Sequence, residues 1–130
     1  GLSLGVKLAS PDRPVVALMG DGGFLYNPVV QSLGAARDSG LPVLIIVFNN
    51  SRYGAMRGGY SRYYEDGVAV SDDNLRGVHI NGPDYAELAP LFDGHGERVE
   101  DPAELHGALE RGLAAVKGGQ FAILNVVVSR

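Results

Sequence analysis

The sequence predicts an α/β protein with a doubly wound, mostly parallel sheet and helices on both of its faces. Two observations support this fold class. Short, continuous apolar runs that suit buried strands alternate along the chain with longer segments of helical periodicity. Glycine-rich or polar turns follow the first two apolar runs directly, as they do at the carboxyl edge of parallel sheets. The expected order is helix, strand, helix, strand, long loop, helix, strand, helix, strand.

Four segments are expected to form the strands. Residues 15–19, 43–48 and 121–128 are continuous apolar runs, which are typical of strands buried on both faces. Residues 97–100 are expected to add a short fourth strand. Helices between these segments would make the connections parallel crossovers.

The first two expected helices are marked by their ends and their apolar positions. Residues 1–9 form the first helix, which ends in a turn at residues 10–14 that contains two prolines and an aspartate. Its apolar positions are Leu2, Val6 and Ala9. The second helix has Asn27 as its N-cap and Pro28 at its first helical position, and Ser39-Gly40 ends it. The inner stripe of the second helix consists of Val29, Val30, Leu33 and Ala36.

Two further helices are expected in the second half of the chain. Residues 81–83 open the third helix, Gly94 closes it, and its apolar face consists of Tyr85, Leu88, Ala89 and Phe92. Asp101 and Glu104 form a capping box for the fourth helix, with Pro102 at its first helical position. This helix ends at Gly118-Gly119 and is expected to bury Leu105, Ala108, Leu109, Gly112, Leu113 and Val116.

Residues 51–80 are expected to form a long irregular stretch rich in glycine, arginine and tyrosine. A loop of this length in a compact domain is usually functional or mobile. Its aromatic and basic residues could suggest RNA stacking, but the acidic balance of the chain favours a flap over a site or a contact with other domains. Of the three histidines, His79 is the one that could face a ligand from this stretch.

Composition limits the classes of protein to consider. The 130 residues suffice for one domain with one core, so residues 1–130 are expected to form a single domain. The net charge of −4 argues against nucleic acid or an anionic membrane as the main partner. The chain has no cysteine, which fits a cytoplasmic protein, and no apolar run long enough to span a membrane.

A candidate ligand site follows from the turns after the first two strands. Asp21 lies between Gly20 and Gly22-Gly23, and Asn49-Asn50 ends the next strand. Parallel strands end at the same edge of the sheet, so these groups converge there. A carboxylate, side-chain amides and glycine backbone suit Mg²⁺ carrying a phosphate-bearing ligand. The structural alternatives are that Asp21 caps a turn and that Asn49 ends its strand by bonding to the local backbone, without binding a ligand.

These motifs do not match the common nucleotide-binding loops. Leu25 stands where a dinucleotide-binding fingerprint needs its third glycine, and no Gly-Lys-Ser/Thr follows as in a P-loop. Gly22 and Gly23 could be turn residues only. The sharper interpretation is that their N–H groups approach a diphosphate closely, aided by the positive end of the helix that begins near Asn27.

The order of Gly20-Asp21-Gly22, Asn49-Asn50, residues 51–57 and residues 83–89 resembles the thiamine-diphosphate (ThDP) motif and the segments after it. The family is the superfamily of acetolactate synthase, pyruvate decarboxylase and benzoylformate decarboxylase. The resemblance covers nearly the whole chain, as the diphosphate-binding domain. The interval from Asp21 to Asn50 looks slightly longer than usual, so extra length is expected in the intervening helix or its exit loop.

The resemblance implies a set of site residues. Mg²⁺ would be bound by the Asp21 carboxylate, the Asn50 side-chain oxygen and the Arg52 backbone carbonyl, with two diphosphate oxygens and a water. Tyr53 and Gly54 would lie along the diphosphate. The implied cofactor-binding residues are Gly20, Asp21, Gly22, Gly23, Asn50, Arg52, Tyr53 and Gly54. No catalytic residue is expected in this chain, because the glutamate that acts on the cofactor comes from another domain in this family.

The implied function is that of a ThDP- and Mg²⁺-dependent lyase or transferase acting on a 2-oxo acid by decarboxylation, carboligation or both. The chain is expected to be a fragment of a three-domain polypeptide and inactive alone. Its expected partners are a pyrimidine-binding domain and further copies in a homodimer or homotetramer. The alternatives are the ThDP subunit of a 2-oxo acid oxidoreductase and a non-catalytic module that binds phosphate or nucleotide.

Overall fold

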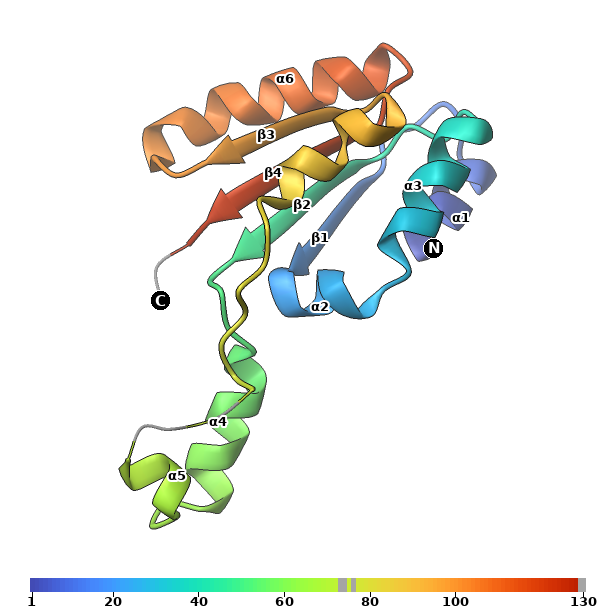
Figure 1. The fold of residues 1–130 in the computed structure, drawn as a ribbon. Helices are drawn as coiled ribbons and strands as arrows, with labels where there is room; N and C mark the ends of the chain where they lie inside the picture. Colours follow the sequence, from blue (N-terminus) through green and yellow to red (C-terminus); the bar gives the residue numbers. More distant parts are fainter. Residues whose placement is uncertain (73–74, 76, 129–130) are drawn as a thin grey trace.

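The alternating apolar and amphipathic segments form a parallel sheet flanked by helices. The computed structural model describes residues 1–72, 75 and 77–128. In this part of the chain the strands are β1 (Val16–Gly20), β2 (Leu44–Asn49), β3 (His95–Val99) and β4 (Ala122–Val127). They are all parallel, in the spatial order β1-β2-β4-β3 (Figure 1). The predicted α/β class and doubly wound parallel sheet are confirmed.

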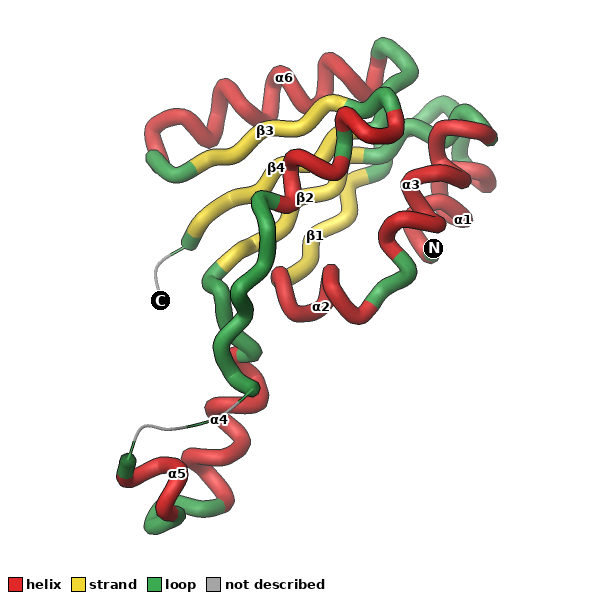
Figure 2. Tube along the Cα trace, viewed as in Figure 1, coloured by secondary structure: helices red, strands yellow, loops and turns green. Residues whose placement is uncertain are grey.

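Helices cover both faces of the sheet (Figure 2). One face packs against α1 (Leu2–Ala9), α3 (Val29–Asp38) and the 3₁₀ helix η1 (Tyr85–Leu88), and the other packs against α6 (Leu105–Lys117). Alternate residues of β2 point to opposite faces, so Ile45 and Val47 belong to the first layer. Leu44 and Ile46 belong to the second. The six residues predicted to form the buried stripe of α6 are buried or partly buried.

Two apolar segments are more exposed than their sequences predict. On β1, the side chain of Leu18 is 64% exposed, because β1 is an edge strand and the contacts of α6 are with β2, β3 and β4. On α1, Leu2, Val6 and Ala9 are exposed, whereas Leu4 packs against the core. Burial on both faces was therefore the wrong prediction for β1. A continuous apolar run does not distinguish an edge strand from a central one.

The buried polar residue of α1 is Lys7, which holds the turn that follows. Its ammonium group donates hydrogen bonds to the carbonyl oxygens of Pro11 and Arg13, at 2.7 and 2.9 Å. The charged group is thereby paired with backbone acceptors as it leaves water. This contact joins α1 to the start of β1.

The turn after β1 is not the loop that its glycines predict. Helix α2 (Asp21–Tyr26) begins directly after Gly20, and Asn27 ends it. The Asn27 side chain donates to the Gly23 carbonyl oxygen at 2.6 Å, so it does not act as the N-cap of α3. The N-cap is Pro28, so α3 begins at Val29, one residue later than predicted.

Residues 51–80 were predicted to be irregular, and the described residues of this segment (51–72, 75 and 77–80) form an arm that projects from the body of the domain (Figure 1). The arm contains α4 (Gly54–Tyr63) and α5 (Val68–Ser71). Its base is a short antiparallel contact, in which Tyr53 N donates to Val78 O and Ile80 N donates to Ser51 O. Gly58 and Gly59 lie inside α4, where glycine is unfavourable, which explains why the sequence did not predict a helix.

The remaining boundaries differ from the prediction in detail. The expected single helix after residue 83 is split into η1 and η2 (Pro90–Phe92). Asp101 accepts a hydrogen bond from Ala103 N, and η3 (Pro102–Glu104) precedes α6, so the side-chain bond is not the one to Glu104 N that a capping box predicts. The fourth strand, β3, begins two residues earlier than predicted. No helix in the described part of the chain is long and apolar enough to cross a membrane.

Candidate functional site

The carboxyl ends of β1 and β2 border a hollow of about 420 Å³. The two strands are in register there, with Gly20 opposite Phe48. All eight residues that the sequence predicted for cofactor binding line this hollow. They are Gly20, Asp21, Gly22, Gly23, Asn50, Arg52, Tyr53 and Gly54. Asp21 and Asn50, which are 29 positions apart in the sequence, therefore lie at the same hollow, as the parallel topology predicts. The role of the eight residues as ligands stays a prediction.

Asp21 is the buried charged group of the hollow. It is 2% exposed, and its Oδ1 atom accepts a hydrogen bond from Gly22 N at 3.0 Å. Its Oδ2 atom is buried without a hydrogen-bond partner. A carboxylate oxygen in this state is costly unless a cation or donor pairs with it. The geometry thus supports the ligand interpretation of Asp21 over the simple turn cap.

Gly22 is required by the ring of Tyr53. A Cβ atom at residue 22 would lie 2.6 Å from Cδ1 and 2.8 Å from Cε1 of that ring, which is closer than real Cβ contacts allow. Tyr53 also stacks at a tilt against Tyr26, with ring centroids 5.6 Å apart. At Gly23, by contrast, a Cβ atom would meet nothing within 4 Å. The two glycines of the motif therefore differ: only Gly22 is needed for packing in this structure.

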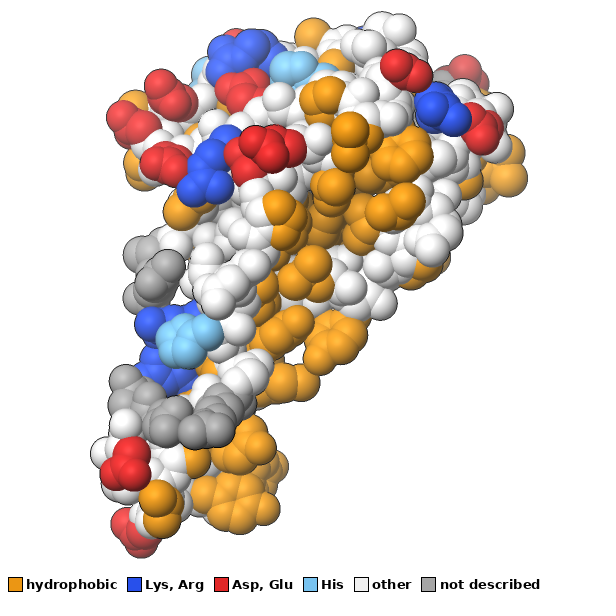
Figure 3. All heavy atoms as spheres, viewed as in Figure 1, with side chains coloured by type: hydrophobic (Ala, Val, Ile, Leu, Met, Phe, Trp, Pro, Cys, Tyr) orange, Lys and Arg blue, Asp and Glu red, His pale blue; other side chains and the backbone are white. Residues whose placement is uncertain are grey.

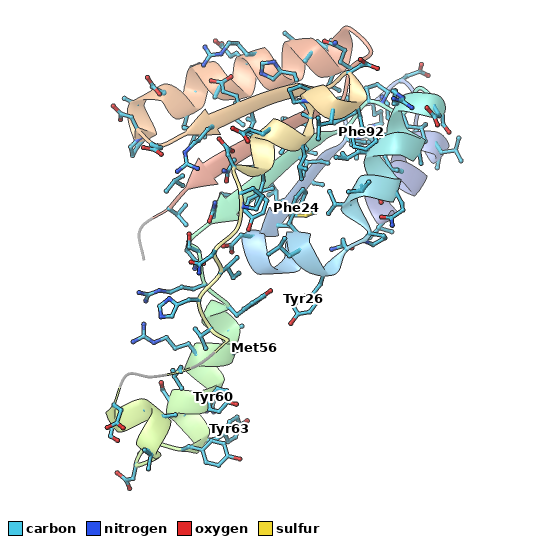
Figure 4. The ribbon with its side chains drawn as sticks, in the orientation of Figure 1. Phe24, Tyr26, Met56, Tyr60, Tyr63 and Phe92 are labelled. Atoms are coloured by element: carbon cyan, nitrogen blue, oxygen red, sulfur yellow. The ribbon has the colours of Figure 1, made fainter. Side chains whose placement is uncertain are left out.

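The helix that adjoins the hollow is α2, not the one beginning near Asn27. The first three residues of α2 line the hollow, whereas no residue of α3 does. Figure 4 shows Tyr26 at the far end of α2 and Met56 near the start of the arm, and both contribute to the lining. The predicted contribution of the α3 positive end is therefore wrong.

Two residues of the turn after β2, Asn50 and Arg52, line the hollow and carry oxygen atoms. The Asn50 Oδ1 atom accepts a hydrogen bond from Arg52 N at 3.0 Å. An amide oxygen has two lone pairs, so this contact leaves one for a further interaction. The Arg52 carbonyl oxygen accepts no hydrogen bond from the described residues. Both oxygens are of the kind that a hard cation prefers.

The side chain of Asn49 is held by hydrogen bonds to other residues of the protein. Its side chain is buried, accepts hydrogen bonds from Ser51 N and Oγ, and donates to Asn125 Oδ1. Ser51 has a φ of +55°, in the left-handed region, where a residue with a Cβ atom loses roughly 1–2 kcal/mol. Of the two interpretations left open for Asn49, the structure supports closure of the strand. The neighbouring Asn50 is the one that lines the hollow.

The donor set fits a magnesium ion. One carboxylate, one amide oxygen and one backbone carbonyl leave several positions for water and phosphate oxygens, as Mg²⁺ requires. Among the described residues there is no cluster of three or more His, Cys, Asp or Glu that could hold a metal. The Asp21 site would not form such a cluster, because two of its three donors are an asparagine side-chain oxygen and a backbone carbonyl oxygen.

Tyr85 is a residue near the site that the sequence assigned only to the core. It is 1% exposed, and its hydroxyl group has no hydrogen-bond partner. Burial, followed by the negative charge of Asp21, raises the pKa of the Tyr85 hydroxyl above its usual range. Its ring packs edge-on against Phe24 of α2 at 5.3 Å. Nothing in the sequence indicates that the Tyr85 hydroxyl group is buried near Asp21, since its position fits an apolar helix face.

The arm carries a separate apolar surface. A hollow of about 640 Å³ on the arm is lined by Met56, Gly59, Tyr60, Tyr63, Tyr64, Gly67, Val68, Ala69 and Val70. Figure 3 shows hydrophobic side chains gathered on one side of the arm, and Figure 4 shows Tyr60 and Tyr63 on the same side of α4. His79 does not line the Asp21 hollow. It pairs with Arg52 across the base of the arm and borders a much smaller cavity.

Comparison with protein families identifies one match. The family model described as "Thiamine pyrophosphate enzyme, C-terminal TPP binding domain" matches residues 1–126. The chain is 34% identical over 129 residues to the acetolactate synthase large subunit of Parasynechococcus marenigrum (strain WH8102). It is 36% identical over 130 residues to the 2-hydroxyacyl-CoA lyase of Arabidopsis thaliana. The alignments cover 98% of this chain but only 19% and 21% of these relatives.

Solved structures with the same fold lead to the same group of enzymes. The ThDP-dependent 4-hydroxybenzoylformate decarboxylase of Rhodococcus jostii RHA1 superposes with a TM-score of 0.74 at 31% identity, over 98% of this chain and 21% of that one. Benzoylformate decarboxylase from Polynucleobacter necessarius gives a TM-score of 0.70 at 26% identity, over 98% and 22%. The chain therefore spans about a fifth of the length of the proteins it matches.

Proposed function

Because the chain belongs to the C-terminal TPP-binding domain family of thiamine pyrophosphate enzymes, we propose that it anchors the diphosphate of ThDP through Mg²⁺. The observation that carries the proposal is the buried, unpaired Oδ2 atom of Asp21 in a hollow lined by all eight predicted cofactor residues. The resemblance assigns Asp21, Asn50 and Arg52 as the metal ligands. In the structure their oxygen atoms offer the chemistry that such a site needs.

Each part of the site has a distinct task in this proposal. Asp21 supplies the negative charge that neutralises part of the cation, and Asn50 and Arg52 supply neutral oxygens. Gly22 lets the Tyr53 ring lie against the first turn of α2. When bound, ThDP would supply a nucleophilic thiazolium carbon and a positively charged ring that accepts the electrons released from a 2-oxo acid. This chain binds and orients the cofactor and contributes no catalytic residue.

The proposed parent protein is a lyase or transferase that decarboxylates or joins 2-oxo acids, as acetolactate synthase and benzoylformate decarboxylase do by their names. The chain corresponds to about a fifth of such relatives. We therefore propose that it works as one domain beside a pyrimidine-binding domain, in a cytoplasmic homo-oligomer. Alone it is expected to be inactive toward pyruvate and benzoylformate, and detectable decarboxylation by the purified chain would contradict this part.

Calorimetric titration tests the cofactor assignment. ThDP is titrated into the chain with Mg²⁺ and again with EDTA, for the wild type and Asp21→Ala. Saturable binding that requires both Mg²⁺ and Asp21 is expected. Asp12→Ala is the matched control, because Asp12 is an exposed carboxylate in the turn before β1, at the opposite edge of the sheet. The same titrations on the proposed full-length parent follow, and absence of Mg²⁺-dependent binding there would end the proposal.

Two experiments test the two alternative functions, ATP competition for a phosphate- or nucleotide-binding module and acceptor reduction for a 2-oxo acid oxidoreductase. If the domain were a general phosphate- or nucleotide-binding module, ATP would displace ThDP at comparable concentration. A ThDP-specific site retains ThDP in excess ATP. A 2-oxo acid oxidoreductase would be recognised in the parent by reduction of an electron acceptor with the 2-oxo acid as donor, which a decarboxylase or synthase does not require.

A further inference from the structure

We propose that Asn125 is a positioning residue, which holds the turn after β2 in its metal-binding shape through a directed chain of hydrogen bonds from Asp84. This inference rests on the proposed function, because the turn matters for the metal through Asn50 and Arg52. Asn125 lies on β4 and is fully buried. It does not line the hollow, so its effect on the site would be indirect.

The position of Asn125 is unusual for an amide side chain. It lies two residues after Ile123, so it points into the apolar layer that also contains Val47 and Tyr85. Two polar contacts satisfy it there. Its Nδ2 atom donates to Asp84 Oδ1 at 2.8 Å, and its Oδ1 atom accepts from Asn49 Nδ2 at 3.2 Å. A buried amide with both ends paired orders its neighbours rather than loosening the core.

The carboxylate of Asp84 determines which group donates and which accepts in each hydrogen bond of this series. An ionised carboxylate only accepts hydrogen bonds, so the NH₂ group of Asn125 must face it. The Asn125 oxygen then faces Asn49, and only the NH₂ group of Asn49 can donate to it. The Asn49 oxygen is therefore turned toward Ser51, where it accepts from the backbone N at 3.0 Å and from Oγ at 3.3 Å.

The series of hydrogen bonds from Asp84 ends at the strained part of the turn after β2. Ser51 has its left-handed backbone conformation between the two candidate ligands Asn50 and Arg52. The bond from Ser51 N to Asn49 fixes that conformation, and the bond from Arg52 N to Asn50 Oδ1 continues it. Asp84 is itself anchored, because it caps η1 by accepting from Ala86 N at 3.0 Å. Asn125 thus connects a capped helix to the metal-binding turn.

Substitutions in this series of hydrogen bonds should change the affinity of the protein for metal as well as its stability. Asn125→Leu keeps a similar volume and removes both polar contacts, and Asp84→Ala removes the contact to Asn125 together with the cap. Direct partners of metal ligands typically alter metal affinity by about 10- to 100-fold. Asn125 acts through Asn49 and Ser51 and not on a ligand itself, so a loss near the lower end, about tenfold in Mn²⁺ affinity, is expected of both variants. The measurement is electron paramagnetic resonance of Mn²⁺ with ThDP present. Asp84→Asn retains an acceptor oxygen and is expected to recover most of the affinity lost in Asp84→Ala.

Asp101→Ala is the matched control for Asp84→Ala. Asp101 caps η3 through Ala103 N at 2.9 Å, the same kind of bond that Asp84 makes to Ala86 N, but it has no contact with the site. It should lower stability without changing Mn²⁺ affinity. If Asn125→Leu also lowers only the denaturation midpoint and leaves Mn²⁺ affinity unchanged, Asn125 is merely structural and the proposal is overturned.

Amide hydrogen exchange gives a readout that does not depend on the cofactor. In the protein without metal, the amides of Ser51 and Arg52 should exchange at least about tenfold faster in Asn125→Leu. The amide of Ala122, which donates to Val43 O in the sheet, serves as the internal reference. Unchanged exchange at Ser51 and Arg52 overturns the inference. If the wild type fails to bind Mn²⁺ with ThDP, the proposed function falls, and the exchange comparison still decides whether Asn125 holds the turn.

Discussion

The turns that follow β1 and β2 adjoin the same hollow but are built in opposite ways. After β1 the chain enters α2 at once, and the Asp21 carboxylate keeps one oxygen buried and unpaired. After β2, both asparagine side chains bond to backbone N–H groups two residues ahead. The first turn therefore leaves one buried acceptor oxygen without a hydrogen-bond partner among the described residues. In the second, side chains hold the backbone so that other oxygens can be offered.

The difference shows how one site divides binding from positioning. A free carboxylate oxygen lowers stability unless something binds to it, since burial removes its water. Paired amides do not have this cost, and they preserve a backbone shape that a serine would not adopt by itself. Two pairs of substitutions, at Gly22 and Gly23 and at Ser51, test this division, and two further pairs test sites outside the turns. They follow in order from the largest expected effect to the smallest.

Gly22→Ala should have the largest effect, because the added methyl group meets the Tyr53 ring at 2.6 Å. Overpacking of this kind costs about 1–3 kcal/mol, and the displaced ring should also weaken Mg²⁺-dependent ThDP binding. Gly23→Ala, one residue on, meets nothing within 4 Å and should raise stability by about 0.4–1 kcal/mol. Chemical denaturation measures both. Equal effects of the two substitutions would show that the contact with Tyr53 is not what requires glycine.

Ser51→Val tests the turn after β2. Serine already has the Cβ atom that makes a φ of +55° unfavourable, and valine adds branching at that atom, so Ser51→Val should cost on the order of 1 kcal/mol more, besides the lost Oγ contact. Ser51→Gly relieves the strain but adds freedom to the unfolded chain, so its stability should stay within roughly 1 kcal/mol of the wild type. The measurement is thermal unfolding in the absence of metal. If valine is tolerated as well as glycine, the left-handed turn does not exist in solution.

Tyr85→Phe should raise stability slightly. Its hydroxyl group is buried without a partner, and such a group costs about 1–3 kcal/mol in general, so about 1 kcal/mol is expected from its removal. Tyr63→Phe is the control, because Tyr63 is 78% exposed on the arm and its hydroxyl group is in water. A lower unfolding temperature for Tyr85→Phe would mean that the hydroxyl group is hydrogen-bonded in solution.

Glu97→Gln should have the smallest effect and lies away from both turns. The hydrogen bond from Arg111 lowers the pKa of Glu97 below 4.5. A depressed carboxyl pKa adds stability above the unfolded value, and this stability is lost as the pH falls through the folded value. The wild type should therefore exceed Glu97→Gln at pH 7, and the difference should shrink on acidification below about pH 4.5. Glu87→Gln, at an exposed site with no ion pair among the described residues, should show no such trend in pH-dependent denaturation.

Local patterns in the sequence predicted the strands and the convergence of Asp21 with Asn49-Asn50, whereas Arg52, Tyr53 and Gly54 were implied by the family resemblance. Apolar runs define strands, and parallel connections bring their carboxyl ends to one edge. The turn residues Asp21 and Asn50 could thus be assigned to one site without knowing any side-chain contact. Local signals were also sufficient for α6, whose buried stripe follows the helical period over 13 residues.

Only the tertiary structure decided which of these residues are exposed, paired or strained. Asn49 and Asn125 are 76 positions apart, and no local pattern indicates that their amides meet. The exposure of Leu18 depends on where α6 lies, and the helices of the arm form despite glycines at residues 58 and 59. Hydrogen bonding and burial depend on what packs nearby in space. Sequence periodicity predicts local secondary structure, but it does not predict which distant residues pack together.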